Sequence, residues 1–365
     1  MDQQALIDAI AAEPRARFLW EVYADWLLDR GDPRGELIHL ELAIESGLAD
    51  PDALEQVRGV TDEALVSPRL RAQLQFWQLE FRRGFIRCAM LTDAPTFATA
   101  GEVIGVEAID ALFADQHAAL LDTLNLRQGE TSQSSLASAA LAAPRHALRQ
   151  LRIGDLGSIA ARLNENAPAL EQLAIHASSE GDAVGILAHD NVRDLSSCTS
   201  ACPAVCTGTV SLPRLESLTW EIIGDDALLR PGSLLFHPPP GLATIALELL
   251  SDDEWGRPDV LQNNVVALLA TSPVARQIRS LSVTSPHFGH IADLCDRASA
   301  FPQLVKFEAS TVSVYGPRLD AVALRALSER FERTFAGIER IVSWDSIERM
   351  NRSGEWGERE PRDSP

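Results

Sequence analysis

The sequence of 365 residues predicts an α/β protein, in which a small helical cap at the N-terminus precedes an irregular solenoid of repeats with a parallel sheet. Two observations predict this fold class. The first 46 residues show the apolar spacing of short helices, and the later chain repeats an apolar strand pattern every 22 or 23 residues. With 46% hydrophobic residues, the chain can bury a sizeable core as one elongated domain or as two compact ones.

The predicted cap occupies residues 1–46 and consists of short helices. Its apolar positions recur at three- and four-residue steps and are Leu6, Ala9, Ile10, Phe18, Val22, Trp26 and Leu27. Gly31 then suits a left-handed residue that ends a helix, Asp32 suits an N-cap, and Pro33 suits the first helical position. A third helix, apolar from Leu37 to Ile44, is expected to pack against its two predecessors.

Two motifs in this cap point to a known family. They are Tyr-Ala-Asp-Trp-Leu at residues 23–27 and Arg-Gly-Asp-Pro-Arg-Gly-Glu at residues 30–36. With Ala-Ile-Ala-Ala-Glu-Pro at residues 9–14, they resemble the bacterial repeat-companion domain, a module found ahead of leucine-rich-like repeats. The family has no assigned catalytic residues. We therefore interpret the motif residues as maintaining the fold; they are Tyr23, Asp25, Trp26, Gly31, Asp32, Gly35 and Glu36.

The flanking segments are less regular. Residues 47–90 are expected to form a linker and a helical connection leading into the first strand, with a helix-start signal at Asp50-Pro51-Asp52. Within them, Glu-Phe-Arg-Arg-Gly-Phe-Ile at residues 80–86 resembles the strand-leading segment that often follows the repeat-companion domain. Residues 346–365 are expected to form a disordered tail, because the sequence from Asn351 onward lacks apolar periodicity.

The chain between these flanks contains a repeated pattern. Leu-x-x-Leu-x-apolar occurs at residues 148–153, 170–175 and 215–220, with a degraded copy around Val192 and Leu195. The step of 22 or 23 residues lies within the ~20–29-residue period of leucine-rich repeats, in which each unit supplies one strand and a returning helix or loop. Looser copies lie at 242–247, 278–283 and 304–307, and outer strands are expected at 124–126 and 338–342. We therefore interpret residues 91–345 as degenerate leucine-rich-like repeats.

These repeats depart from the usual pattern in one respect. An Asn or Cys normally follows each strand and hydrogen-bonds the neighbouring loops, but the corresponding residues here are Leu156, Ser178 and Ile223. Such a ladder is absent from the sequence, so irregular loops and uneven curvature are expected. The alternative is a compact α/β domain whose strands have similar sequences.

Composition excludes several classes of function. A net charge of -20 argues against nucleic-acid binding and against anionic membrane surfaces. No signal peptide is recognisable, and no apolar run approaches the ~18 residues that cross a bilayer, so a cytoplasmic location is expected. The five cysteines are sparse and odd in number, which suits a reducing compartment. Lys306 is the one lysine among 32 basic residues, which indicates a GC-rich genome and agrees with the bacterial resemblance.

The usual catalytic motifs do not occur, so an enzyme, a cofactor and a bound metal are not expected. The sequence contains no phosphate-binding loop, dinucleotide turn, His-Glu-x-x-His or Gly-x-Ser-x-Gly. We interpret His287 and His290 as part of an exposed loop. Cys198, Cys202 and Cys206 are the most suggestive group, since three thiols at steps of four offer soft ligands to a metal or an iron–sulfur cluster. A metal- or redox-binding protein or enzyme centred on them is the alternative hypothesis, although Pro203 interrupts a shared helix face and buried or loop thiols are favoured.

The predicted function is therefore protein–protein interaction by a scaffold module, with another protein held on the repeat surface. The oligomeric state is not predicted. Side chains between the inward apolar positions are the candidate partner-binding residues: Arg149, Arg152, Gln172, Glu216, Thr219, Trp255, Arg279, Ser282 and Glu308. Trp255 follows the acidic run 252–254, which we interpret as a solvated loop. Trp220 is a further candidate anchor because tryptophan is enriched in binding hot spots, but its inward strand position favours the core. A purely structural companion to another protein remains a third hypothesis.

Overall fold

The structure is a computed structural model that describes residues 2–50, 52–53, 66–92, 100–126, 134–154, 156–175, 187–198, 210–223, 234–250, 265–284, 288–310 and 321–342. It divides into two compact units. The N-terminal unit comprises Met1–Val184 and Ala188–Val192, and the C-terminal unit comprises Gly185–Leu187 and Arg193–Pro365.

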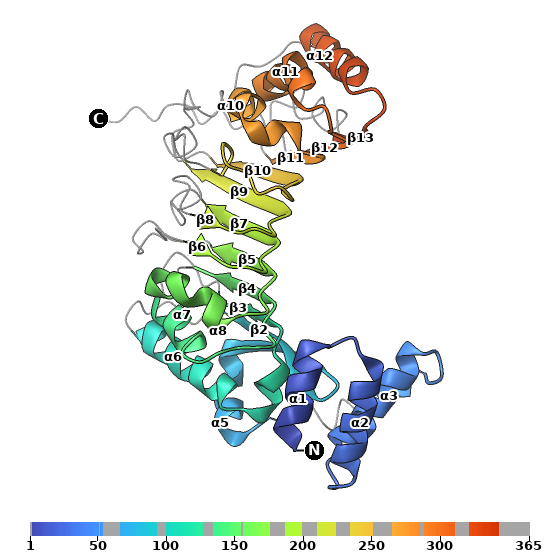
Figure 1. Ribbon diagram of the computed structural model, residues 1–365, viewed down its shortest axis with the longest axis vertical. Coiled ribbons are helices and arrows are strands. Elements are labelled where there is room, and N and C mark those ends of the chain that lie inside the picture. The colour runs from blue at the N-terminus through green and yellow to red at the C-terminus, as the bar shows by residue number, and fades with distance from the viewer. Residues whose placement is uncertain are drawn as a thin grey trace, which may run out of the picture. The chain divides into compact units, whose positions relative to one another are not determined.

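The N-terminal unit begins with three helices and continues with strands and further helices (Figure 1). Its elements are α1 (Gln3–Ala12), α2 (Arg17–Leu28), α3 (Arg34–Glu45), α5 (Pro68–Arg71), η1 (Leu74–Phe76), β1 (Trp77–Arg82), β2 (Phe85–Leu91), α6 (Ala100–Phe113), η2 (Gln116–Leu120), β3 (Thr123–Asn125), α7 (Ser134–Ala140), β4 (Gln150–Ile153), η3 (Gly157–Arg162), α8 (Leu163–Asn166) and β5 (Gln172–Ile175). Figure 1 shows α6, α7 and α8 along the same side of strands β2 to β5.

The C-terminal unit alternates strands with helices in its second half. Its elements are β7 (Asp194–Cys198), β8 (Val210–Ser211), β9 (Ser217–Ile223), β10 (Thr244–Leu250), α10 (Val265–Thr271), η6 (Pro273–Arg276), β11 (Ser280–Thr284), α11 (Phe288–Asp296), η7 (Ala298–Ala300), β12 (Lys306–Ser310), α12 (Ala321–Thr334) and β13 (Glu339–Val342). The short strand β6 (Leu187–Ala188) pairs with β8 in a separate two-stranded sheet.

The main sheet has eleven strands in the order β1-β2-β3-β4-β5-β7-β9-β10-β11-β12-β13. Strand β1 pairs with β2 in antiparallel fashion. The other pairs described within each unit are parallel. The predicted α/β class is therefore confirmed as a mixed fold with a large, mostly parallel sheet, and the strands expected at 124–126, 148–153, 170–175, 215–220 and 338–342 are all present with bounds that differ by three residues or fewer.

The helical cap forms as the sequence predicts, with one correction at the start of its third helix. Gly31 has a φ of 71° and follows the end of α2, as expected for a left-handed residue. Asp32 is not the N-cap, because Pro33 occupies that position and α3 begins at Arg34. The Asp32 carboxylate still accepts the backbone N–H of Arg34 at 3.0 Å, so it satisfies one of the unpaired amides at the start of the helix.

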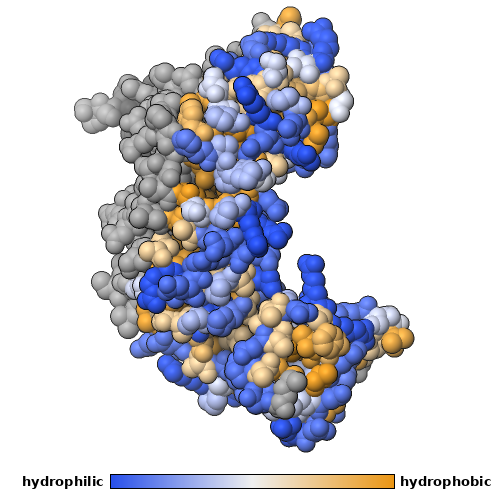
Figure 2. All heavy atoms as spheres, viewed as in Figure 1, coloured by the Kyte–Doolittle hydropathy of each residue, from blue (hydrophilic) through white to orange (hydrophobic). Residues whose placement is uncertain are grey.

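The cap packs onto the first strands through a single apolar core. Its buried members are Leu6, Ile7, Ile10, Ala11, Trp20, Tyr23, Ala24, Leu27, Ile38 and Leu42 from the three helices, with Phe85 of β2 and Leu120 of η2. The rings of Trp20 and Tyr23 lie 6.2 Å and 5.7 Å from that of Phe85. Helices α2 and α3 approach closely at Gly35, where an added Cβ would lie 2.6 Å from the Ala24 carbonyl oxygen. Some apolar side chains remain at the surface (Figure 2). Phe18 of α2 is one of the exposed large hydrophobic residues, at 59% exposure.

A β-hairpin occupies part of the segment that the sequence assigns to a linker and helical connection. Strands β1 and β2 are joined by Arg83 and Gly84, whose φ angles are 55° and 70°. Two left-handed residues in a two-residue loop match the twist of an antiparallel hairpin. The segment at 80–86, which resembles a strand-leading sequence, is thus a strand, a turn and the start of the next strand.

The apolar positions of the repeated pattern form buried rows across the parallel strands. In the N-terminal unit, Leu124, Leu151 and Leu173 are in register and buried. In the C-terminal unit, the first such row runs through Leu218, Ile245, Leu281 and Phe307, and the second through Trp220, Leu247, Val283 and Ala309. The side chains between them are partly or fully exposed, because successive residues of a strand point to opposite faces.

A recurring hydrogen-bond pattern holds the turns that lead into these strands. The Asp122 carbonyl accepts the N–H groups of both Arg149 and Gln150, and the Arg149 carbonyl accepts those of Glu171 and Gln172. The same double acceptance recurs in the C-terminal unit at the carbonyls of Arg193, Glu216, Ala243 and Arg279. We call this arrangement the turn ladder. It leaves each acceptor residue directly before a strand, with its side chain at the strand's N-terminal end.

Candidate binding surface

Each unit presents a polar face on its parallel strands. The N-terminal strand face consists of Thr123, Asn125, Gln150, Arg152 and Gln172. The C-terminal strand face consists of Ser217, Thr219, Thr244, Ala246, Ser280, Ser282, Lys306 and Glu308. All of these residues are half-buried or exposed, and all alternate along the strands with buried apolar residues. These two faces, each taken alone, are the candidate surfaces for a partner.

Five of the predicted partner-binding residues lie on these faces. Arg152 and Gln172 are exposed on the N-terminal strand face. Thr219, Ser282 and Glu308 share one register row of the C-terminal strand face, in which Ala246 lies between the first two. The structure therefore brings together three residues that are as many as 89 positions apart in the sequence.

Three other predicted residues, Arg149, Glu216 and Arg279, lie on the turn ladder instead of on a strand. Arg149 forms an ion pair with Glu171, and Glu216 lies 3.6 Å from Arg193. Both therefore have partners within the chain. Arg279 is exposed and forms no ion pair with the part of the chain that the structure describes. Of the three, Arg279 is the most available to a partner.

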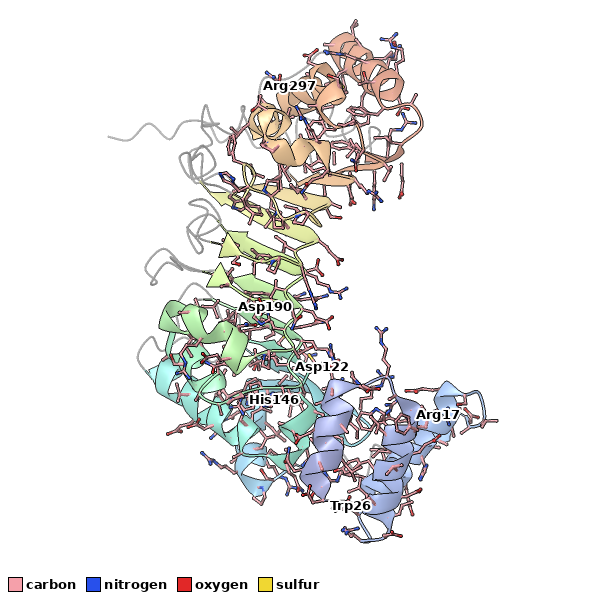
Figure 3. All side chains as sticks on the ribbon, viewed as in Figure 1. Arg17, Trp26, Asp122, His146, Asp190 and Arg297 are labelled. Carbon is pink, nitrogen blue, oxygen red and sulfur yellow. The ribbon has the colours of Figure 1, made fainter. Side chains whose placement is uncertain are left out.

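The ladder ion pairs were not predicted, although the sequence contains a signal for them. Asp122, directly before β3, also pairs with Arg87, the third residue of β2, so opposite charges recur between neighbouring strands (Figure 3 labels Asp122). Arg149 and Glu171 are 22 residues apart, which is the repeat step itself. Opposite charges separated by one repeat length are thus the pattern that would have indicated these contacts. Exposed pairs of this kind contribute little stability, about 0–1 kcal/mol each.

The two tryptophan candidates have different outcomes. Trp220 is fully buried on the inward face of β9, so the core interpretation is confirmed and an anchoring role is wrong. Trp255 and the acidic residues 252–254 lie outside the described residues, which end at 250 and resume at 265. The surviving candidates on the C-terminal strand face are hydroxyl-bearing and charged side chains without an exposed aromatic residue among them.

A set of side chains missed by the sequence analysis links two consecutive turns of the N-terminal unit. The Nε2 of His189 lies 2.9 Å from the carbonyl oxygen of Ala167, and the Asn191 amide donates to the carbonyl of Pro168 at 2.8 Å. Asn164 donates to the carboxylate of Asp190 at 3.0 Å (Figure 3 labels Asp190). These contacts span 22 to 26 residues. They join neighbouring turns, as an Asn or Cys ladder does in the usual leucine-rich repeat. Here, however, the side chains come from the segment just before strand β7 instead of from the loop that follows a strand.

The buried His189 is fixed in one protonation state by this set. Its Nδ1 accepts the N–H of Asn191 at 3.1 Å, so the proton is on Nε2, which donates to Ala167. Burial lowers the pKa of His189, against the opposing effects of the Ala167 carbonyl and the Asp190 carboxylate. The imidazole is therefore neutral at neutral pH and serves as a structural hydrogen-bonding group.

The cap motif residues separate into buried and exposed ones. Tyr23 is fully buried, and Trp26 stacks on it with ring centroids 6.0 Å apart (Figure 3 labels Trp26). Gly35 is the contact between α2 and α3, and Asp32 holds the buried Arg34. Asp25 pairs with His39 at 2.9 Å and is largely exposed, and Glu36 is exposed on α3. Their contacts are those of a folded cap.

The predicted metal candidates are mostly outside the described residues. Cys198 ends β7, while Cys202 and Cys206 lie in the stretch 199–209 that the structure does not describe. Within the described ranges, no three or more His, Cys, Asp and Glu side chains gather in a group that could hold a metal ion. His287 is also outside these ranges. His290 is inside α11 and only 2% exposed, so its interpretation as part of an exposed loop is wrong.

Comparison with known proteins identifies no family. No protein-family model matches the chain, and no curated protein gives a significant match. The chain is similar to a solved structure of a protein from Bacteroides fragilis, with 14% identity and a TM-score of 0.47 over 68% of this chain and 72% of that one. In the parts of the chain that the structure describes, no helix has the length and apolarity needed to span a membrane.

Proposed function

We propose that this chain is a non-enzymatic bacterial scaffold, in which a cap of the repeat-companion type begins an irregular leucine-rich-like solenoid that holds a protein partner in the cytoplasm. The single observation that supports the proposal most strongly is the in-register polar row of the C-terminal strand face. Stacked parallel strands with one polar, partly exposed side suit extended contact with another protein.

The solenoid interpretation is supported by the turn ladder. In the N-terminal unit its bonds reach back 27 residues, from Arg149 to Asp122, and 22 residues, from Glu171 to Arg149. In the C-terminal unit they reach back from residues 216, 243, 279 and 305 to acceptors at 193, 216, 243 and 279, which gives steps of 23, 27, 36 and 26 residues. One turn geometry recurs at every step while the connecting length varies. A repeating unit held by its predecessor agrees better with a degenerate repeat array than with a compact α/β domain.

The chemistry of the C-terminal strand face favours a protein partner. Serine and threonine hydroxyls at 217, 219, 244, 280 and 282 both donate and accept hydrogen bonds, and they lose little side-chain entropy when a partner covers them. Lys306 and Glu308 lie 3.7 Å apart and largely cancel, and the next row along the strands adds the carboxylate of Glu248. The absence of a concentrated charge on this face does not suit nucleic acid, whose phosphates require a basic footprint. Arg279 at the edge supplies a charged anchor.

The test is affinity capture from the native organism with the full-length chain and matched variants. Ser282→Arg places a long charged side chain in the centre of the polar row and is expected to abolish capture of the partner. Ala326→Arg adds the same side chain at an exposed position of α12, away from the strands, and is expected to leave capture unchanged. Circular dichroism of both variants verifies that the fold is retained.

A second strand-face variant makes the affinity-capture test independent of the Ser282→Arg substitution alone. Thr219→Arg lies in the same row as Ser282, with Ala246 between them, and is expected to have the same effect. A partner retained by both strand-face variants would show that this face is not the binding surface. A partner lost equally from Ala326→Arg would show that charge rather than position is responsible.

A further inference from the structure

A hollow in the N-terminal unit is lined by four arginines, although the chain as a whole carries a net charge of -20. Its volume is 210 Å³, and its lining residues are Pro14, Arg15, Trp20, Glu45, Arg82, Arg83 and Arg87. They come from the turn between α1 and α2, from α2 itself at Trp20, from the end of α3, and from the β1–β2 hairpin. The volume is several times the ~30 Å³ that a water molecule occupies in the liquid, so a small ion fits inside.

Both the backbone conformation and the burial of Arg83 in this hollow are energetically unfavourable. Arg83 is the one non-glycine residue with a positive φ among those described, and that conformation is disfavoured for an L residue because its Cβ approaches the following carbonyl oxygen. Asn or Gly would serve the turn better. The Arg83 side chain is almost fully buried, lies 4.6 Å above the Trp20 ring, and leaves its Nε without a hydrogen-bond partner. A strained, buried cation in an otherwise acidic protein indicates a role beyond the turn itself.

The carboxylates around the hollow do not balance its guanidinium groups. Glu45 is shared, since Arg82 donates to its Oε1 and Arg83 donates to both of its oxygens. Arg87 is paired with Asp122, and the buried Glu41 acts electrostatically on Arg83. The four arginines therefore face three carboxylates. Arg15 is exposed and has no carboxylate within ion-pair distance among the described residues.

Hydrogen-bond donors are also in excess. A guanidinium has five N–H donors and no acceptor, whereas Arg82 uses one donor on Glu45 and its side chain remains 58% exposed. Arg15 is anchored on a different segment from the hairpin arginines, so donors approach the hollow from separate directions. A planar carboxylate is matched by one fork of two parallel donors, while a tetrahedral oxyanion offers oxygens to several guanidinium groups at once.

We propose that this hollow binds an oxyanion of the phosphate class, with Arg15 and Arg82 as its principal donors and Arg83 as the buried charge behind them. The site is separate from the strand faces and does not depend on the proposed function. Glu45 positions Arg82 and Arg83 through the ion pairs described above. The phosphate comes either as the free ion or as a phosphoryl group on a serine side chain, and the two share the same chemistry.

Calorimetric titration of the full-length chain at low ionic strength tests the proposal. Inorganic phosphate is expected to bind saturably with a dissociation constant of about 1 mM or lower. Arg15→Ala and Arg82→Ala are each expected to weaken binding about tenfold or more, because each removes charge-assisted hydrogen bonds. Neither residue is buried, so neither variant depends on refolding of the core. Arg69→Ala, an exposed arginine on α5 outside the hollow, is the matched control and is expected to bind like the unmodified chain.

Further titrants decide the class and the source of the ligand. Phosphoserine that binds at least as well as inorganic phosphate supports a phosphorylated side chain as the source, whereas binding of inorganic phosphate alone supports the free ion. Acetate at the same ionic strength is expected to bind more weakly. Equal affinity for acetate would overturn the assignment to phosphate, and the proposal as a whole fails if phosphate does not saturate or if Arg15→Ala and Arg82→Ala bind it unchanged.

Discussion

Replacement of Trp26 is expected to reveal how the cap is held together. Its indole stacks on Tyr23 at an interplanar angle of 13°, and the Arg30 guanidinium lies 3.7 Å from its ring centroid. A fully buried tryptophan replaced by alanine loses about 3–5 kcal/mol, and Trp26 is only partly buried, which favours the lower end. Its Nε1 is buried without a hydrogen-bond partner, and its removal returns about 1 kcal/mol. The expected net loss for Trp26→Ala is about 2 kcal/mol.

The assay is urea unfolding monitored by far-ultraviolet circular dichroism, with the slope of the transition held constant between variants. Trp26→Phe retains the stack on Tyr23 and removes the unpaired N–H, so it is expected to lose less than about 1 kcal/mol. Phe18→Ala, an exposed aromatic residue on the same helix, is the control and is expected to change stability by about 0.5 kcal/mol or less. An unchanged Trp26→Ala variant would remove Trp26 from the scaffold. A loss in Trp26→Phe equal to that in Trp26→Ala would mean that the indole N–H has a stabilising partner.

Three further predictions use the same unfolding measurement. Gly35→Ala is expected to destabilise the cap by about 1–3 kcal/mol because its Cβ would meet backbone and side chain of α2, whereas the exposed Glu36→Ala is expected to be nearly neutral. Burial would raise the pKa of Asp115, but hydrogen bonds from His117 and Ser67 outweigh it and hold that pKa well below its usual range. The resulting stability is present above about pH 4 and is lost as pH falls through the lowered pKa. The free energy of unfolding of Asp115→Asn should therefore fall less steeply on acidification than that of the unmodified chain. An equally steep fall would contradict this role of Asp115. Burial lowers the pKa of His189, so the His189 imidazole is protonated more readily in the unfolded chain than in the folded one. The free energy of unfolding is therefore expected to fall as pH drops below about 6.5, and His189→Ala should flatten that part of its dependence on pH. A pH dependence parallel to that of the unmodified chain would refute this prediction.

The repeat strands could be predicted because their signal is local. Leu151 and Leu173 occupy the same position of a short pattern, and the alternation of apolar and polar residues determines which side chains turn inward. The same alternation correctly separated the buried Trp220 from its neighbour Thr219. Strand position and facing direction therefore follow from a few consecutive residues.

Contacts between repeats could not be predicted in the same way. His189 bonds a carbonyl 22 residues earlier, and nothing in its own neighbourhood in the sequence indicates that acceptor. The hairpin turn at Arg83 and Gly84 was missed because its first residue is not one of the Asn, Asp or Gly residues that usually signal such turns. His290 was assigned to an exposed loop, whereas it lies in α11 and packing of that helix buries it. Each miss involves a tertiary contact that overrides a local preference.

The variable steps of the turn ladder have a consequence for how such a chain can change in length. Steps from 22 to 36 residues are accommodated by one turn geometry, so the additional residues are confined to the returning connections. Closing a loop of 36 rather than 22 residues costs less than about 0.6 kcal/mol in chain entropy. Insertions in these connections are therefore nearly neutral for folding, whereas a single residue added between an acceptor carbonyl and its strand would shift the strand register and turn its apolar side chains outward. Natural variation and protein engineering can therefore change the length of the returning connections, but not the spacing between an acceptor carbonyl and its strand.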